Sequence, residues 1–222
     1  MKPLHPWKVA PEEAIRIQEN LRHRIILKRT FSDIRTIGGA DVSYQKEGDF
    51  LFGAMVVLSF PQMETLHVAM ARGKISFPYV PGLLAFREAP ILIKTFQNLR
   101  IRPDLLIFDG QGIAHPRGMG LASHLGLWFN VPSIGCAKTP LLGEPITPGF
   151  SRGSFEVILK DGRRVGVVLR TKDGVRPVFV SPGYRIDLPT SIRLIRESCQ
   201  GFRLPEPLRR AHQLSRMLRE KF

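Results

Sequence analysis

The chain has 222 residues, of which 43% are hydrophobic and 23% are charged. At roughly 150 residues per domain, this length predicts a single domain, and the composition excludes a largely disordered chain. The 33 Lys and Arg residues outnumber the 19 Asp and Glu residues, and the resulting net charge of +14 favours a polyanionic partner. We expect nucleic acid rather than a membrane surface, because the basic residues are spread along the whole chain and no basic amphipathic helix dominates.

The sequence lacks the features of membrane and secreted proteins. Its most apolar run, 51–60, is far shorter than the roughly 20 residues that a membrane span needs. Lys2 and His5 occupy positions where a signal peptide would have an apolar core. Cys136 and Cys199 stand far apart in no paired spacing, which indicates neither a disulfide framework nor a zinc knuckle. We therefore expect a cytoplasmic protein with no membrane partner, and as a separate expectation we take it to be a monomer.

The first half of the chain predicts a helix, three antiparallel strands and a second helix. An amphipathic helix begins at Pro11, which is followed by two acidic residues, and ends near Lys28. Short connectors between three strand-like runs predict an antiparallel meander. These runs span 37–43, 50–60 and 65–72. Pro90 fits the first turn of a helix that we expect to reach about Leu99.

The second half predicts two parallel strands joined by a helix, followed by hairpins. The run 103–109 is apolar and ends in Asp-Gly, which is typical of a strand covered on both faces. A helix at 121–130 and a short strand at 132–137 complete a strand–helix–strand crossover. Two Asp-Gly turns between β-branched runs predict a hairpin insertion at about 151–181. Two basic helices close the chain, at 189–198 and 205–221. This order of elements predicts one mixed α/β sheet with helices on its faces.

Three carboxylates are placed to converge at one edge of this sheet. Asp41 lies in the first strand, Asp109 ends the apolar strand, and Glu88 precedes the helix that leads to that strand. Ligand sites in α/β sheets favour the carboxyl ends of strands, and oxygen ligands without cysteine favour Mg²⁺ or Mn²⁺ over zinc. Acids that bind a metal on a basic protein are typical of phosphodiester cleavage. The structural alternatives are a turn residue for each Asp and a solvated charge near a helix start for Glu88.

Basic side chains near the same edge have two interpretations each. His115, in the loop after Asp109, can orient water, bind the metal or contact phosphate, and the alternative is a histidine bonded to backbone. Lys138 follows the second parallel strand, where phosphate contact is favoured over solvent. We expect His124 to be a packing residue and His212 to lie on a solvated helix face.

The segment 77–84, which we call the wedge segment, combines two prolines with an aromatic residue. Pro78 and Pro81 stiffen a stretch that presents Tyr79, and a stiff aromatic meets the physical requirement for a wedge inserted into a base stack. A rigid wedge loses less conformational entropy on binding than a flexible one. The alternative is a Tyr packed under a turn.

Four segments carry a combination of motifs that is highly specific. They are 39–43 (Gly-Ala-Asp-Val-Ser), 77–88 (Phe-Pro-Tyr-Val-Pro-Gly-Leu-Leu-Ala-Phe-Arg-Glu), 108–117 (Phe-Asp-Gly-Gln-Gly-Ile-Ala-His-Pro-Arg) and 134–138 (Ile-Gly-Cys-Ala-Lys). With these motifs the chain resembles the endonuclease V family, deoxyinosine-directed endonucleases of the RNase H-like superfamily, over nearly its whole length. Val80 and Cys136 stand where other members often carry a different small apolar residue, which leaves the catalytic assignments untouched.

The resemblance implies roles for particular residues. Asp41, Glu88 and Asp109 would be the catalytic acids that bind Mg²⁺, with Mn²⁺ as a substitute. Tyr79 would separate the strands. Active-site support is implied for His115 and Lys138. The implied substrate-binding positions around the extruded base are Pro78, Pro81, Gly82, Leu84, Gly110 and Gly120.

The implied activity is DNA repair. Such an enzyme recognises deoxyinosine, whose base is the hypoxanthine formed by adenine deamination, and hydrolyses the second phosphodiester bond 3′ to the lesion, leaving 3′-hydroxyl and 5′-phosphate ends. A single RNase H-like domain would span 1–222. Family members differ in their preference for DNA or RNA, so an inosine-specific endoribonuclease stays open. A non-catalytic nucleic-acid-binding protein is the second alternative, although acids without a metal would repel phosphate.

Overall fold

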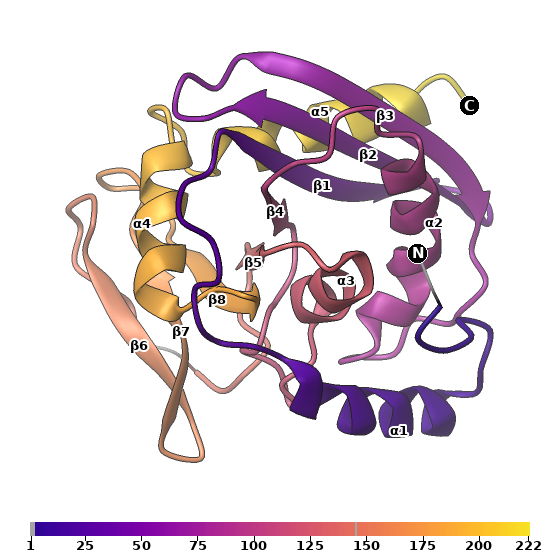
Figure 1. Cartoon of the computed structure of the whole chain (residues 1–222), viewed down its shortest axis with the longest axis horizontal. Helices are drawn as coiled ribbons and strands as arrows, with labels where there is room; N and C mark the ends of the chain where they lie inside the picture. The colour runs from indigo at the N-terminus through magenta and orange to yellow at the C-terminus, as the bar shows by residue number, and fades with distance from the viewer. Residues whose placement is uncertain (1–2, 145) are drawn as a thin grey trace.

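A computed structural model describes residues 3–144 and 146–222 and contains one eight-stranded mixed sheet. The strands lie in the order β3-β2-β1-β4-β5-β8-β7-β6 across the sheet (Figure 1). Their bounds are β1 Thr36–Tyr44, β2 Phe50–Ser59, β3 Thr65–Lys74, β4 Leu105–Phe108, β5 Ser133–Ala137, β6 Phe155–Lys160, β7 Arg163–Leu169 and β8 Val178–Tyr184. The predicted mixed sheet is therefore confirmed.

The first five strands have the predicted directions. β1, β2 and β3 form an antiparallel meander, and β4 and β5 run parallel to β1 and to each other. β2 and the whole of β4 are strongly buried, because helices cover the sheet on both sides, and this explains their continuous apolar runs. The carboxyl ends of β1, β4 and β5 consequently meet at one edge.

The predicted hairpin insertion extends this same sheet. β6 and β7 are joined by a tight turn at Asp161-Gly162, where both residues have positive φ, as a two-residue hairpin of type I′ requires. β7 then pairs antiparallel with β8, and β8 pairs antiparallel with β5. The second Asp-Gly turn, at 173–174, lies in the loop between β7 and β8.

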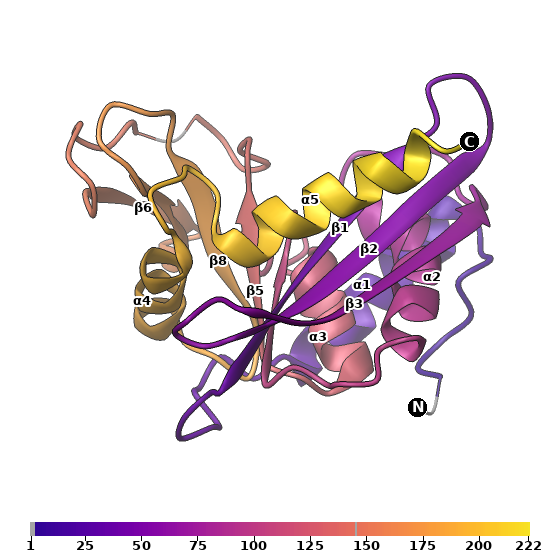
Figure 2. The ribbon, with the colours of Figure 1, turned by 90° about the horizontal axis from the view of Figure 1, so that it is seen from above.

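Helices cover both faces of the sheet (Figure 2). The helices are α1 Pro11–Leu21, the short 3₁₀ helix η1 Arg22–Arg24, α2 Leu84–Gln97, α3 Leu121–Phe129, α4 Leu188–Ser198 and α5 Glu206–Arg219. α2 and α3 pack on one face and α4 and α5 on the other, each pair with its own hydrophobic core. α1 lies outside α2 and α3 and buries Ala14, Ile17 and Leu21 against them. No helix among the described residues has the length and apolar character to cross a bilayer.

Two predicted helix boundaries were wrong. The first helix ends at Leu21 rather than near Lys28, because Ile25 becomes extended and packs toward the β6–β7 hairpin as well as toward α1. α2 begins at Leu84, so Pro90 lies inside the helix and not in its first turn. A buried stripe that includes Phe86 and Leu92 continues across Pro90, and this packing outweighs the cost of a proline in a helix interior, about 3 kcal/mol.

Candidate active site

The register of the sheet brings Asp41 and Asp109 together. Ala40 of β1 pairs with Phe108 of β4, so the two aspartates occupy the next positions on neighbouring parallel strands. The backbone N–H of Asp109 donates to the carbonyl of Ala40 at 3.3 Å, which fixes this alignment. Neighbouring strands lie about 4.8 Å apart. Both carboxylates therefore reach the same edge, as the sequence predicted.

Glu88 joins them from α2, one turn inside the helix and not before it as expected. Its Oε1 accepts a hydrogen bond of 2.7 Å from the Tyr44 hydroxyl at the end of β1. Burial, and secondarily the charges of Asp41 and Asp109, raises the pKa of Glu88 to about 8. Burial likewise raises the pKa of Asp41, with a further contribution from Asp109. Asp41 and Glu88 are buried and Asp109 is partly exposed, and a cation would relieve the repulsion among the three carboxylates.

The last helix supplies two partners of Asp41 that the sequence analysis missed. Ser215 Oγ donates to Asp41 Oδ2 at 2.6 Å, and His212 Nδ1 lies 3.3 Å from the same oxygen. His212 was expected on a solvated face, but α5 packs directly on β1 and turns this side chain toward the site. Gly39 permits that approach, since a Cβ there would lie 2.1 Å from the carbonyl oxygen of Pro207.

Lys138 occupies the position that the sequence predicted, directly after β5. Its ammonium forms an ion pair with the Asp109 carboxylate, and both side chains are partly exposed. A cation at this point can hold Asp109 in place and face a phosphate that enters from solvent.

As the side chains stand, no three His, Cys, Asp or Glu residues within 3–144 and 146–222 are grouped closely enough to hold a metal ion. Each of the three carboxylates instead has a protein partner. Asp41 accepts a hydrogen bond from Ser215, Glu88 accepts one from Tyr44, and Asp109 pairs with Lys138. Their chemistry nevertheless fits a hard divalent cation, because all three donors are carboxylates, of which Asp41 and Glu88 are buried, and because their charges repel one another.

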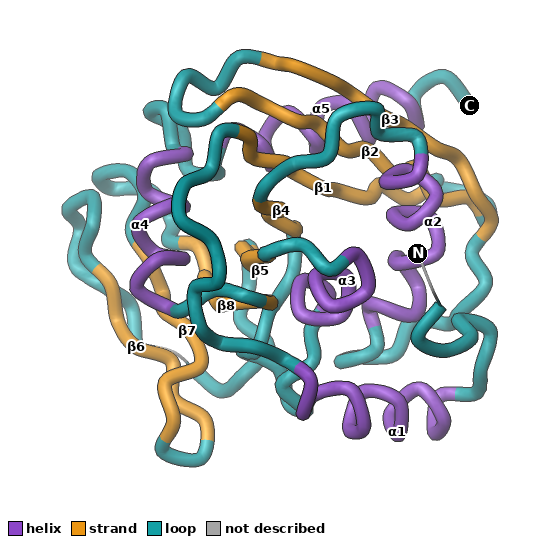
Figure 3. Tube along the Cα trace, in the orientation of Figure 1, coloured by secondary structure: helices purple, strands orange, loops and turns teal. Residues whose placement is uncertain are grey.

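A cavity of about 410 Å³ opens beside Asp109 and Lys138, within the range of about 300–1,000 Å³ of small-ligand sites. It lies where two loops meet, the wedge segment before α2 and the glycine-rich loop (110–120) between β4 and α3, both drawn as loops in Figure 3. The predicted residues that line it are Tyr79, Pro81, Gly82, Leu84, Asp109, Gly110 and Lys138. Tyr79 is 72% exposed at its rim, so it is not packed under a turn.

Two predicted base-binding residues lie outside this cavity. Gly120 is buried behind it, donates its N–H to the carbonyl of Gly112 at 2.9 Å, and would place a Cβ 2.3 Å from the Gln111 carbonyl oxygen. Close packing of the backbone therefore requires glycine at position 120. The neighbouring Leu121 lines the cavity. Pro78 is exposed on the wedge segment but does not line the cavity.

His115 connects the glycine-rich loop to the wedge segment. Its Nε2 donates to the Gly82 carbonyl at 2.8 Å, while its Nδ1 accepts from the backbone N–H of Arg117 at 3.1 Å and of Met119 at 3.4 Å. This pattern requires the neutral ring, and burial lowers the pKa of His115 to about 4. Both nitrogens are engaged by backbone, so His115 positions the two loops and is not directed at metal or phosphate.

Acid is expected to weaken the fold through His115. Because its pKa in the folded protein lies below its ordinary value of 6.5, the neutral ring contributes stability that is present above pH 6.5 and is lost as the pH falls towards 4. The loss amounts to about 3 kcal/mol. His115→Asn should flatten the dependence of unfolding free energy on pH in this window, measured by urea titration. The exposed His23→Asn serves as the control, and an equal effect of both changes would contradict this role.

Comparisons with known proteins agree on one family. The family model described as Endonuclease V matches residues 19–213. Endonuclease V of Dictyoglomus thermophilum is 50% identical over 205 residues, which cover 92% of this chain and 89% of that protein. The crystal structure of Endonuclease V from Streptomyces avermitilis superposes with a TM-score of 0.91 at 41% identity and covers 97% of this chain and 95% of the other.

A further solved structure contains nucleic acid. It is Ciona intestinalis Endonuclease V in complex with a 24mer DNA containing an inosine followed by a ribo-adenosine. Its TM-score is 0.86 at 30% identity, and the match covers 95% of this chain and 98% of the other.

Proposed function

This chain belongs to the endonuclease V family, and on that premise we propose that it nicks DNA at deoxyinosine in a metal-dependent reaction. Membership makes it a nuclease that acts on DNA, with the RNase H-like fold of its structural neighbours. The recognition of inosine agrees with the inosine-containing complex of the Ciona relative. The metal, the bond cleaved and the roles of individual residues are part of the proposal.

One observation carries it: a cavity of about 410 Å³ opens beside Asp109, one of the three carboxylates. Its lining combines Tyr79, Gly82 and Gly110 of the two loops with Asp109 and Lys138. A nucleotide turned out of its helix would place its base between the wedge segment and the glycine-rich loop. Its backbone would then run past the carboxylate edge, which suits cleavage near the lesion without removal of the base.

In the proposed mechanism, Asp41, Glu88 and Asp109 would hold Mg²⁺ or Mn²⁺. The bound metal supplies Lewis-acid activation of the phosphate and of the attacking water. Lys138 orients Asp109 and contributes positive charge toward the phosphate, where negative charge develops in the transition state. That the second phosphodiester bond 3′ to the lesion is the one cleaved is proposed from the resemblance to the family alone.

α5 supports the same reaction through Asp41. Ser215 holds one carboxylate oxygen by donating its hydroxyl proton, and Ser43 in turn donates to the carbonyl of Ser215 at 2.7 Å. His212, which is partly exposed, lies beside the buried Asp41. A ring in this place can hold or transfer a proton at Nδ1 beside the carboxylate.

The direct test is nicking of an end-labelled duplex that carries one deoxyinosine, with and without Mg²⁺, beside the matching adenine duplex. We expect Mg²⁺-dependent cleavage on the 3′ side of inosine only. The Asp109→Ala protein should not cleave. Equal cleavage of both duplexes, or cleavage in the presence of excess chelator, would contradict the proposal.

An inosine-specific endoribonuclease is the second candidate. The observation that favours it is the ribo-adenosine that follows inosine in the Ciona complex. Single-turnover rates on matched strands with one inosine in DNA or in RNA decide between the two, and a faster RNA rate assigns the ribonuclease. Tight binding without cleavage of either strand would instead indicate a non-catalytic nucleic-acid-binding protein.

Tyr79→Ala is expected to weaken binding of the inosine duplex about fivefold or more, since stacking of a base on an aromatic ring contributes about 1–3 kcal/mol. The effect on an inosine-containing single strand should be smaller, because no partner strand needs to be separated. Fluorescence anisotropy in chelator measures both, with Tyr79→Phe as the control that keeps the ring. Equal losses of affinity for the duplex and for the single strand would contradict the proposed role of Tyr79 as a wedge.

The cytoplasmic location and the monomeric state stay predictions. The cysteines agree with a reducing compartment in that both Cys136 and Cys199 are buried free thiols.

A further inference from the structure

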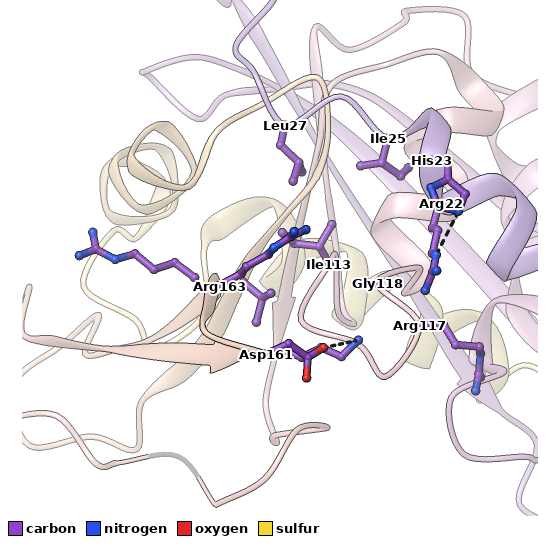
Figure 4. Close-up of a pocket in the computed structure, with 12 residues that line it drawn as sticks. Arg22, His23, Ile25, Leu27, Ile113, Arg117, Gly118, Asp161 and Arg163 are labelled. Atoms are coloured by element: carbon purple, nitrogen blue, oxygen red, sulfur yellow. Dashed lines mark hydrogen bonds and ion pairs between the residues drawn. The ribbon is translucent and has the colours of Figure 1, made fainter.

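A second cleft, of about 450 Å³, lies on the other side of the glycine-rich loop from the base cavity. η1 and the chain just after it form one wall and the β6–β7 hairpin forms the opposite wall, with Ile113 and Gly118 between them (Figure 4). The residues that line it are Arg22, His23, Ile25, Leu27, Ile113, Arg117, Gly118, Lys160, Asp161, Arg163, Arg164 and Val165. None of them lines the base cavity.

Three hydrogen bonds made by the glycine-rich loop connect the cleft to the wedge segment and to α1. Lys160 of the hairpin donates to the carbonyl of Pro116 at 2.6 Å. Arg117 donates to the Gly82 carbonyl at 2.8 Å and to Gln18 Oε1 at 2.6 Å. The same loop therefore presents Gly110 to the base cavity and Arg117 to the cleft, so one continuous ligand can pass from one to the other.

Positive charge dominates the cleft. Its lining includes five Lys or Arg residues and one histidine against a single carboxylate, Asp161, which lies 3.9 Å from Lys160. Arg22, Arg163 and Arg164 are exposed and take part in none of the ion pairs formed within 3–144 and 146–222. Guanidinium groups left to solvent in a concave surface attract an anionic ligand.

We propose that this cleft binds the sugar–phosphate backbone of nucleic acid that flanks the lesion, and thus forms a second contact surface for the substrate of the proposed function. The arginines stand on two opposite walls, which suits a strand running between them more than a single phosphate ion. Guanidinium groups match phosphate oxygens in geometry. Apolar side chains at the base of the cleft, Ile113 and Val165, suit the faces of the sugars.

The test uses an undamaged fluorescent duplex in chelator, so that neither inosine nor cleavage enters the measurement. The variant is Arg163→Gln with Arg164→Gln. The matched control is Arg35→Gln with Arg100→Gln, which removes the same charge from two exposed positions that precede β1 and β4 and do not line the cleft. Thermal melting verifies that both variants fold.

We expect the cleft variant to bind more than about tenfold more weakly at about 0.1 M salt, and the slope of log K against log salt to become shallower by about 0.9 per lost phosphate contact. The control should keep the wild-type slope. Equal losses in both variants, or no loss in the cleft variant, would overturn the inference. Nicking of the inosine duplex by the wild-type protein decides the proposed function separately, so failure of one does not imply failure of the other.

Discussion

Asp109→Asn is expected to slow nicking of a deoxyinosine duplex at least about a thousandfold. The change keeps the size of the side chain but removes one of the three charges that would hold the metal. Metal activation of a phosphoryl oxygen contributes several kcal/mol to the transition state, and about 4 kcal/mol corresponds to three powers of ten in rate. The Lys138 ammonium, whose partner is Asp109, remains and cannot replace the lost carboxylate.

Single-turnover kinetics at excess protein over duplex measure this loss without interference from product release. Asp41→Asn should give a loss of the same order, because Asp41 occupies the equivalent position on the adjacent strand. Asp33→Asn is the matched control, since Asp33 is exposed and lies outside the site. A rate within tenfold of wild type for either site variant would exclude that carboxylate from the metal site.

The lengths of the apolar runs and of their connectors were sufficient to predict the strand directions in the first half of the sheet. The meander follows from short connectors between apolar runs, and the parallel pair follows from the apolar run that ends at Asp109. Together these two patterns bring Asp41 and Asp109 to one edge, as the register of β1 and β4 confirms. Lys138 was placed correctly for the same reason, because it follows a strand parallel to β4.

Contacts between distant elements were not predictable in this way. His212 and Ser215 reach Asp41 because α5 packs on β1, and nothing in the sequence of α5 specifies that face of the sheet. Helical spacing alone shows that His212 neighbours the buried positions Leu208, Ala211 and Ser215. This periodicity was the available signal that His212 lies near the core and not fully in solvent.

His115 in the glycine-rich loop and His124 on α3 differ in how well their surroundings could be predicted. His124 was expected to pack in the interior, and it is fully buried on α3 with its Nε2 at 2.7 Å from Nε2 of His5. For His115 the sequence left open a role at the ligand or a bond to backbone, and its partners are backbone groups of Gly82 and of its own loop. Loop backbone geometry determines such contacts, and residue types alone do not encode it.

Glu88→Gln is expected to stabilise the metal-free protein while it abolishes nicking. The pKa of Glu88 is raised to about 8, so the folded protein binds a proton at this residue that the unfolded chain releases above pH 4.5. The contribution of Glu88 to stability is therefore present below pH 4.5 and is lost as the pH rises towards 8. At pH 7 this cost is about 3 kcal/mol, and a neutral glutamine avoids it while its Oε1 can still accept from Tyr44.

Urea unfolding at several pH values measures both the gain and its pH dependence. In chelator, Glu88→Gln should unfold at higher urea than wild type at pH 7, and the two should converge near pH 4.5. Exposed Glu47→Gln should change neither quantity.

Saturating Mg²⁺ should stabilise wild type more than the variant, because a ligand stabilises only the folded state that binds it. A variant less stable than wild type in chelator at pH 7 would mean that Glu88 serves the fold and not the metal site. The opposite result would show that stability is sacrificed at Glu88 to keep a carboxylate where the cation binds.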